Sequence, residues 1–181
     1  MEIDRRTKVL QTAMDLFIHH GYKKVTLADI AAEVGVSRPT LYQVFPNKEE
    51  IFKAIIGNFH KTAIDQIRES RDPNASLDQQ LLDAIDIWTI QPYKLIQASP
   101  RAEEFQDSNM DFAKEALDEA YAGFEALVLE ILNSKKKSRS TVNKDLAHLI
   151  AVSVKGYKFQ AKNLKELKAL VKSLVMLVSA N

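Results

Sequence analysis

Apolar side chains recur every three or four residues along most of this chain, which is the period of an α-helix with one buried face. The first such stretch covers residues 3–20, and Gly21 is well placed to end it. Its apolar positions are Val9, Leu10, Ala13, Met14, Phe17 and Ile18. No stretch alternates convincingly with the period of two that a half-buried strand requires. The pattern therefore predicts an all-α protein.

Two short helices are predicted next. The helix over residues 26–34 starts at Thr26, whose side chain can cap it, and Asp29 follows three residues later in a variant of the capping box. Gly35 closes this helix, and residues 37–45 form the next one. The two helices are separated by two residues only.

The helix over residues 37–45 has one inward and one outward face. Ser37 caps its start, Pro39 lies in the first turn, where a missing N–H does no harm, and Pro46 ends it. Leu41 and Phe45 lie one turn apart and face inward. The exposed or partly exposed positions are Arg38, Thr40, Tyr42, Gln43 and Val44. This is the layout of a helix-turn-helix, whose second helix enters the major groove of DNA.

The outward side chains have the chemistry that DNA contacts require. Arg38 suits guanine and Gln43 suits adenine, each through paired hydrogen bonds, and Thr40 can meet a base or a phosphate. The capped helix starts at Thr26 and Asn47 present free N–H groups that favour phosphate oxygens. The alternative interpretation is three capped helices in an ordinary bundle, with their charges on a solvated face.

The rest of the chain is also predicted to be helical. Asn47 caps a long helix that runs to about Arg68, and Glu50 lies three residues after the cap. Further helices are expected over residues 77–89, between Pro92 and Pro100, and over residues 109–133, 143–159 and 164–178.

The stretch TLADIAAEVGVSRPTLYQVFPNKEEIFKAI, residues 26–55, resembles the DNA-binding segment of the TetR family of bacterial transcriptional regulators. The similarity extends over roughly residues 5–56. Positions that fit the family pattern are Thr26, Ile30, Ala31, Gly35, Val36, Ser37, Leu41, Tyr42, Phe45, Lys48 and Glu49. The chain departs from the family at Pro39, where glycine is frequent, and at Gln43–Val44, where an aromatic or histidine pair is frequent. These departures affect the expected base preference and leave the expected fold unchanged.

The resemblance implies a homodimer that binds a pseudo-palindromic operator and is a repressor released by a small-molecule effector. The implied base contacts are Arg38, Thr40 and Gln43. The implied phosphate contacts are Thr26, Tyr42 and Lys48. Residues 1–46 are then the DNA-binding domain and residues 47–181 a helical effector-binding and dimerisation domain, with the helix over residues 47–68 connecting the two.

The last two predicted helices, 143–159 and 164–178, carry more apolar surface than one buried side needs, which indicates a partner. In the TetR family the corresponding pair forms a four-helix dimer interface. The expected interface residues are Leu146, Ile150, Val154, Leu167, Leu170 and Leu174. The alternative is that both helices complete the core of a single chain.

The effector site is expected between the middle helices, lined by large apolar side chains. The candidates are Trp88, Tyr93, Phe105, Met110, Phe112, Tyr121 and Phe124, each of which can equally be a core residue. Acidic residues in the same region suit a cationic ligand, so the expected effector is a small hydrophobic or cationic molecule. A second hypothesis keeps the DNA-binding segment but places the protein under the control of a protein partner, or gives it an architectural role, without a small-molecule ligand.

Charge is distributed unevenly along the chain. Residues 1–68 carry 10 basic and 8 acidic residues, residues 69–119 carry 4 and 12, and residues 120–181 carry 11 and 4. A DNA-binding protein needs a basic face, and the acidic middle does not supply one.

The composition and motifs of the chain exclude or disfavour several kinds of functional site. The chain has no cysteine, which excludes disulfides, zinc–thiolate sites and cysteine nucleophiles. No Ser/His/Asp order, phosphate-binding glycine loop or metal-spaced histidine pair stands out, so we expect no enzyme activity, cofactor or metal. No stretch approaches the length of a membrane span. The expected location is the bacterial cytoplasm, on the nucleoid when the protein is bound to DNA.

Overall fold

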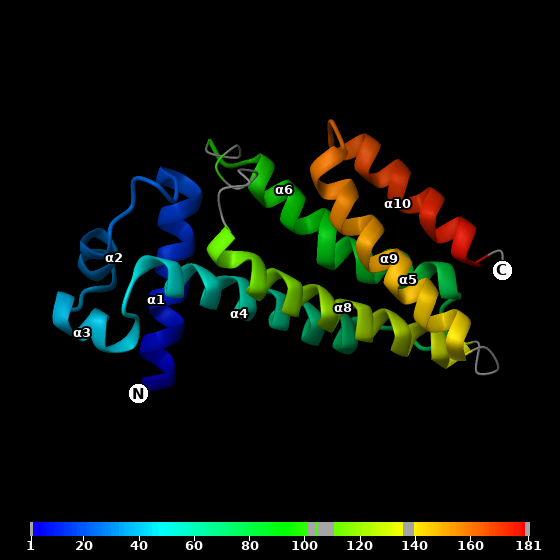
Figure 1. Ribbon diagram of the computed structural model, residues 1–181, viewed down its shortest axis with the longest axis horizontal. Helices are drawn as coiled ribbons and strands as arrows, with labels where there is room; N and C mark the ends of the chain where they lie inside the picture. The colour runs from blue at the N-terminus through cyan, green and yellow to red at the C-terminus, as the bar shows by residue number, and fades with distance from the viewer. Residues whose placement is uncertain (1, 101–103, 105–110, 136–139, 180–181) are drawn as a thin grey trace. The chain divides into compact units, whose positions relative to one another are not determined.

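The computed structural model describes residues 2–100, 104, 111–135 and 140–179, and every described element is helical (Figure 1). The chain folds into two compact units. The first unit contains Met1–Phe59 and Ile96–Asp118, and the second contains His60–Leu95 and Glu119–Asn181. The boundary predicted after residue 46 therefore lies inside the first unit, which also takes in a segment from the middle of the chain.

The first unit is built on three N-terminal helices, drawn in blue to cyan in Figure 1. They are α1 (Glu2–His20), α2 (Leu27–Val34) and α3 (Arg38–Val44). The first part of α4 (Lys48–Ser70), the 3₁₀ turn η2 (Asp111–Ala113) and the start of α8 (Lys114–Lys135) complete it. Its core contains Val9, Ala13, Phe17, Ile30, Ala31, Val34, Leu41, Phe45, Ile51, Phe52 and Ala113.

Local sequence signals place the ends of these helices as predicted. The capping box of Thr26 and Asp29 is present at the start of α2, and Ser37 caps α3. Gly35 ends α2 in the left-handed conformation (φ +80°), where its N–H reaches two carbonyls of the last turn. Only glycine adopts this φ without a steric cost, so the turn between α2 and α3 depends on it.

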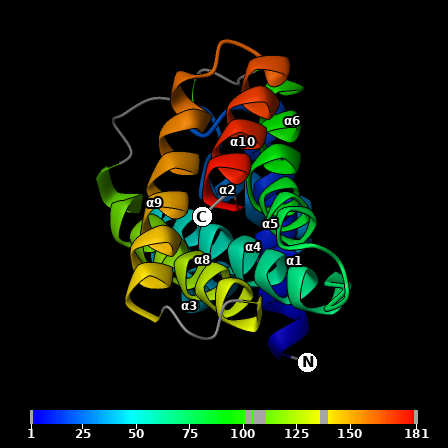
Figure 2. The same cartoon turned by 90° about the vertical axis from the view of Figure 1, so that its right-hand side faces the viewer.

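The second unit is a bundle of helices around a larger core. Its elements are the remainder of α4 and α8, α5 (Leu77–Ile85), the π-helix η1 (Asp86–Ile90), most of α6 (Gln91–Gln97), α9 (Ser140–Gln160) and α10 (Leu164–Ser179). Helix α10 contacts both α9 and α5 (Figure 2). No helix in the described ranges is long and apolar enough to cross a membrane.

The segment from Leu77 to Gln97 differs from its prediction. A helix over residues 77–89 was expected to end before Pro92, but α5, η1 and α6 follow one another without a break. The π-helix η1 immediately precedes Pro92, so the hydrogen-bond pattern of the helix changes at the point where the proline supplies no N–H.

Candidate functional site

Helix α3 has its apolar side chains buried and its polar side chains exposed, as the sequence predicts. Leu41 and Phe45 are buried in the core of the first unit. Arg38 and Gln43 are exposed, and so is Tyr42, with 53% of its surface accessible. The exposed face of this short helix therefore presents a guanidinium, a phenol and an amide, which together can donate to and accept from base edges and phosphates.

Thr40, the third expected base contact, is half-buried and engaged in capping. Its backbone N–H donates to the Ser37 hydroxyl at 3.3 Å, and the two hydroxyl oxygens lie 2.7 Å apart in a second hydrogen bond. The Thr40 hydroxyl can contact DNA only while sharing its hydrogen bonds with Ser37.

Thr26, an expected phosphate contact, is exposed at the start of α2. Its backbone N–H and its hydroxyl both donate to the Asp29 carboxylate, at 2.8 and 2.7 Å. These hydrogen bonds, first that of the side chain, lower the pKa of Asp29. A negative carboxylate thus lies beside the N–H groups that were expected to attract a phosphate.

Lys48, the third expected phosphate contact, lies in the first turn of α4 and binds within its own chain. Its ammonium donates to the carbonyl oxygens of Tyr22 (2.6 Å) and Val25 (2.8 Å) and lies 4.3 Å from the centre of the Tyr22 ring. An ammonium has three N–H donors, so one remains for a further acceptor. Burial lowers the pKa of Lys48.

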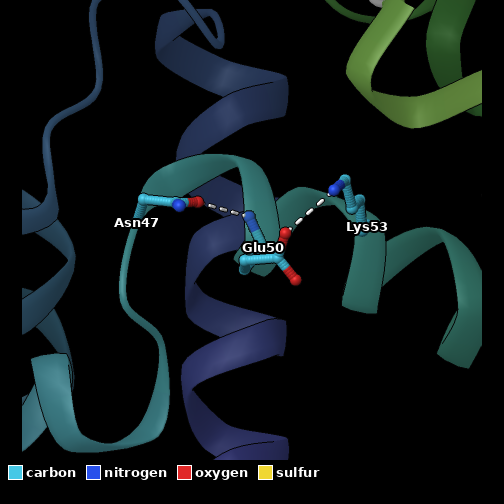
Figure 3. A network of polar contacts seen from close by, with 3 residues as sticks. All are labelled: Asn47, Glu50 and Lys53. Atoms are coloured by element: carbon cyan, nitrogen blue, oxygen red, sulfur yellow. Dashed lines mark hydrogen bonds and ion pairs between the residues drawn. The ribbon is translucent and has the colours of Figure 1, made fainter.

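The start of α4 is fixed by a local network of three side chains (Figure 3). The Asn47 side-chain oxygen accepts from the Glu50 backbone N–H at 2.8 Å, which confirms Asn47 as the cap. The Glu50 carboxylate pairs with Lys53 at 2.8 Å, one turn further along the helix.

Two basic residues of α1 that were not among the expected contacts bind the neighbouring helices. The Arg6 guanidinium lies 4.4 Å from the centre of the Phe45 ring at the end of α3. The Lys8 ammonium donates to the Val34 carbonyl at the end of α2, at 3.0 Å. A cation at a helix C-terminus is stabilising. In the sequence, both residues belong to a cluster of basic residues that precedes the first apolar stripe, and this cluster could have identified them.

The candidate effector residues divide between the two units. Trp88, Tyr93, Tyr121 and Phe124 belong to the core of the second unit. Phe112 belongs to the first unit, where it stacks against Tyr22. Phe105 and Met110 lie outside the described residues. The sequence could not separate these residues, because their large apolar side chains suit the core of either unit.

Trp88 is the centre of an aromatic cluster in the second unit. Its ring stacks on Phe124 (4.6 Å between centroids, 9° between planes) and meets Tyr121 edge-on at 5.7 Å. The His60 ring lies 4.6 Å away. Burial raises the pKa of Tyr121 to about 12, so this phenol is neutral at physiological pH. The Lys155 ammonium lies 5.1 Å from the centre of the Tyr121 ring.

Among the residues that the structure describes, no hydrogen-bond partner is found for two buried polar groups of the π-helix. These are the indole N–H of Trp88, a residue only 3% exposed, and the hydroxyl of Thr89. Buried polar groups are normally paired, and π-helical turns are frequent at functional sites. The π-helix was missed because one extra residue in a turn leaves no clear mark on an apolar pattern.

Four of the six expected dimer residues are buried within the second unit. Ile150, Val154, Leu167 and Leu174 belong to the buried core of the second unit, and Leu146 and Leu170 are partly buried. The large apolar side chains that α9 and α10 expose are instead Val142, Leu149, Val152, Phe159, Met176 and Leu177. Helix α9 also exposes Gly156 on the face of Leu149 and Val152, and an added Cβ there would meet nothing within 4 Å.

Comparison with known proteins places the N-terminal segment in a family. Residues 9–55 match the model of the bacterial regulatory proteins of the tetR family. The biofilm operon negative transcriptional regulator IcaR of Staphylococcus epidermidis is 34% identical over 73 residues, 40% of each chain. The transcriptional repressor ComR of Escherichia coli is 43% identical over 54 residues, 30% of this chain and 26% of its own. The matched segment thus spans less than half the length of these curated relatives.

The similarity of fold extends over the whole chain. A TetR transcription regulator from Haloarcula marismortui superimposes with a TM-score of 0.76, covering 98% of this chain and 97% of its own, at 14% sequence identity. The fold is therefore that of TetR regulators, with an N-terminal helix-turn-helix and a helical C-terminal part.

Proposed function

We propose that this chain is a DNA-binding transcriptional regulator of the TetR family, and more specifically a repressor, because its residues 9–55 match the model of the bacterial regulatory proteins of that family. The observation that carries the proposal is the exposed face of α3, where Arg38, Tyr42 and Gln43 are accessible on a helix held by a buried Leu41 and Phe45. The names of IcaR and ComR, a negative regulator and a repressor, favour repression.

The proposed DNA contacts fall into two groups. Arg38, Thr40 and Gln43 meet base edges. Thr26, Tyr42 and Lys48 meet phosphates. The six residues differ in how accessible their polar groups are. Arg38, Gln43 and Tyr42 are exposed. The polar groups of Thr26, Thr40 and Lys48 already take part in hydrogen bonds within the chain. We expect the exposed three to contribute most of the contacts.

The partner in operator binding is a second copy of the chain. A helix-turn-helix dimer reaches successive major grooves about 34–36 Å apart, and one reading helix alone makes too few contacts for tight binding. The exposed apolar residues of α9 and α10 support a four-helix interface, since monomeric proteins rarely expose such surfaces. Gly156 supports it too, because its missing side chain permits the close approach of another helix.

The effector in this proposal is a small hydrophobic molecule bound near Trp88. The aromatic cluster supplies apolar contact, and the unpaired indole N–H and Thr89 hydroxyl supply donors for an acceptor on the ligand. A cationic effector is less favoured, because Lys155 already holds an ammonium at the Tyr121 ring. Helix α4 contributes residues to both units, so a ligand that prefers one orientation of α4 would alter operator affinity.

Selection from a pool of random duplex DNA tests the regulator proposal. We expect the purified protein to enrich an inverted repeat, and the variant with both Arg38→Ala and Gln43→Ala to lose that enrichment while keeping its helical circular dichroism. Enrichment of unrelated sequences would contradict operator binding. The location that follows from this function is the bacterial cytoplasm, with the protein on the nucleoid when bound to DNA.

A further inference from the structure

The Tyr22 ring is the meeting point of three parts of the first unit. Phe17 of α1 lies 5.2 Å from it and Phe52 of α4 lies 5.0 Å from it, both edge-on. Phe112 of η2 stacks on it at 5.5 Å, with 24° between the planes. The Lys48 ammonium lies 4.3 Å from its centre. Rings in such arrangements attract one another, and a cation near a ring face is attracted by its quadrupole.

Lys48 and Tyr22 together form a clamp between α4 and the turn that joins α1 to α2. One N–H of the Lys48 ammonium donates to the Tyr22 carbonyl and another to the Val25 carbonyl, while the ring of Tyr22 attracts the same charge. Val25 immediately precedes Thr26, the cap of α2. The clamp therefore fixes the first turn of α4 relative to the start of the helix-turn-helix.

Phe112 reaches this clamp from a distant part of the chain. It follows Tyr22 by ninety residues in the sequence, and it also meets the Phe52 ring at 5.7 Å. Its neighbour Ala113 is fully buried in the same core, so η2 is anchored there. The same stretch of chain attaches to α1 at a second point, where the Ser99 hydroxyl donates to the Ile18 carbonyl.

The position of Phe112 has a direct consequence for the clamp. A ring stacked on Tyr22 restricts the orientation of that ring, and the attraction of Lys48 to the ring depends on that orientation. Loss of the stack leaves Tyr22 with its edge-on neighbours only, Phe17 and Phe52. The Lys48 ammonium is then held less firmly at the α1–α2 turn.

We propose that Phe112 is a positioning residue for DNA binding, because it holds the Tyr22 ring in the clamp with Lys48. Through η2, the rest of the chain can then act on the two helices of the helix-turn-helix, α2 and α3. The proposal rests on the proposed function as a DNA-binding regulator. It adds a route of regulation through η2, because α8 starts directly after η2 and carries Tyr121 and Phe124 of the aromatic cluster further along.

Amide hydrogen exchange of the full-length protein tests the positioning without DNA. Phe112→Ala should accelerate exchange at the backbone amides of residues 22–25 and in the first turns of α4. The control is Leu117→Ala, which truncates another partly buried side chain of the same core and should leave these amides protected. Phe112→Tyr should restore protection. Unchanged exchange in Phe112→Ala, or equal acceleration in Leu117→Ala, would overturn the proposal even if the wild type bound no specific sequence.

Binding to the selected duplex gives the second readout. Phe112→Ala should weaken affinity about fivefold or more, within the usual range of coupling between sites. Its salt dependence should stay close to that of the wild type, because the variant keeps the charge of Lys48 and of every other basic residue. Combined with Lys48→Met, the two losses should be less than additive, since both open one clamp. Additive losses would show that Phe112 acts independently of Lys48 and would refute the proposed connection.

Discussion

The Asp29 carboxylate accepts two hydrogen bonds from Thr26, one from its backbone N–H at 2.8 Å and one from its hydroxyl at 2.7 Å. The Asp29 N–H in turn donates to the Thr26 hydroxyl at 3.2 Å, which closes a reciprocal cap at the start of α2. The first helix of the helix-turn-helix is therefore stabilised by a group that can be titrated.

Because of this cap, the free energy of unfolding of the protein should depend on pH in the acid range. The hydrogen bonds from Thr26 lower the pKa of Asp29 below its ordinary value, so the ionised form favours the folded state. The stabilisation is complete above the unfolded pKa and is lost as the pH falls through the folded pKa. In urea denaturation we expect wild type to lose more stability than Asp29→Asn between pH 7 and pH 3. Equal losses would contradict the role of Asp29.

The cap of α2 can also be weakened at neutral pH. Thr26→Ala should destabilise the protein by about 1 kcal/mol, the usual effect of removing a helix cap. Thr26→Ser keeps the hydroxyl and serves as the control. Denaturation of both variants at pH 7 checks this, and equal stability of the two would show that the hydroxyl does not stabilise α2.

Arg38 and Gln43 should determine base preference. Each side chain that reaches a base edge contributes about 1–3 kcal/mol of discrimination. Arg38→Ala and Gln43→Ala should each relax the preference at a defined base pair when the variants select from random duplexes. Lys24→Ala removes an exposed charge outside α3 and should leave the selected sequence unchanged. An unaltered preference in both α3 variants would exclude them from direct readout.

Lys48 and Tyr42 should differ in how salt affects their contributions. Lys48→Ala should weaken binding to all sequences alike and reduce the salt slope by about one, if the free N–H of the ammonium meets a phosphate. Tyr42→Phe removes a hydroxyl but no charge, so it should lower affinity and keep the slope. Titrations at several salt concentrations measure both. If the salt slope of Lys48→Ala is unchanged, Lys48 does not contact a phosphate and serves only in the clamp.

The dimer should depend on the exposed face of α9 and α10. Charges at Leu167 and Leu174 are expected to unfold the chain, because these side chains are 0% and 5% exposed. Leu149→Glu combined with Leu177→Glu should instead give a folded monomer with weakened operator binding. Leu95→Glu alters an exposed leucine on α6 and is the control. Analytical ultracentrifugation and circular dichroism decide the outcome; a folded monomer with wild-type operator affinity would refute the dimer mechanism.

Effector binding can be followed by tryptophan fluorescence, because Trp88 is the only tryptophan of the chain. Its fluorescence should change as a hydrophobic ligand binds. Thr89→Val replaces a buried hydroxyl without a partner and should keep the protein stable while weakening a ligand that accepts from that hydroxyl. A panel of small apolar compounds that alters neither fluorescence nor thermal stability would favour regulation without a small-molecule ligand.

Features that depend on residues close by in the chain followed from the sequence alone. The caps at Thr26, Ser37 and Asn47 bond to groups three residues away, so their geometry follows from local sequence. Helical periodicity gave the all-α class, and the inward and outward faces of α3 followed from the same period. Helix ends at Gly35 and Pro46 required nothing beyond the backbone properties of glycine and proline.

Which of several chemically similar residues makes a given contact depended on the packing of the folded chain. Lys48 could equally have faced solvent, but its partners Tyr22 and Val25 lie 26 and 23 residues away, and only folding brings them within reach. Phe112 has the same apolar character as Phe124, yet the two belong to different units. Helix α10 is apolar on two sides, and packing alone determines that Leu167 and Leu174 are buried while Met176 and Leu177 are exposed. A helical pattern in the sequence predicts on which side of the helix each side chain lies. The residues that pack against that side come from elements distant in the sequence, so the pattern does not identify them.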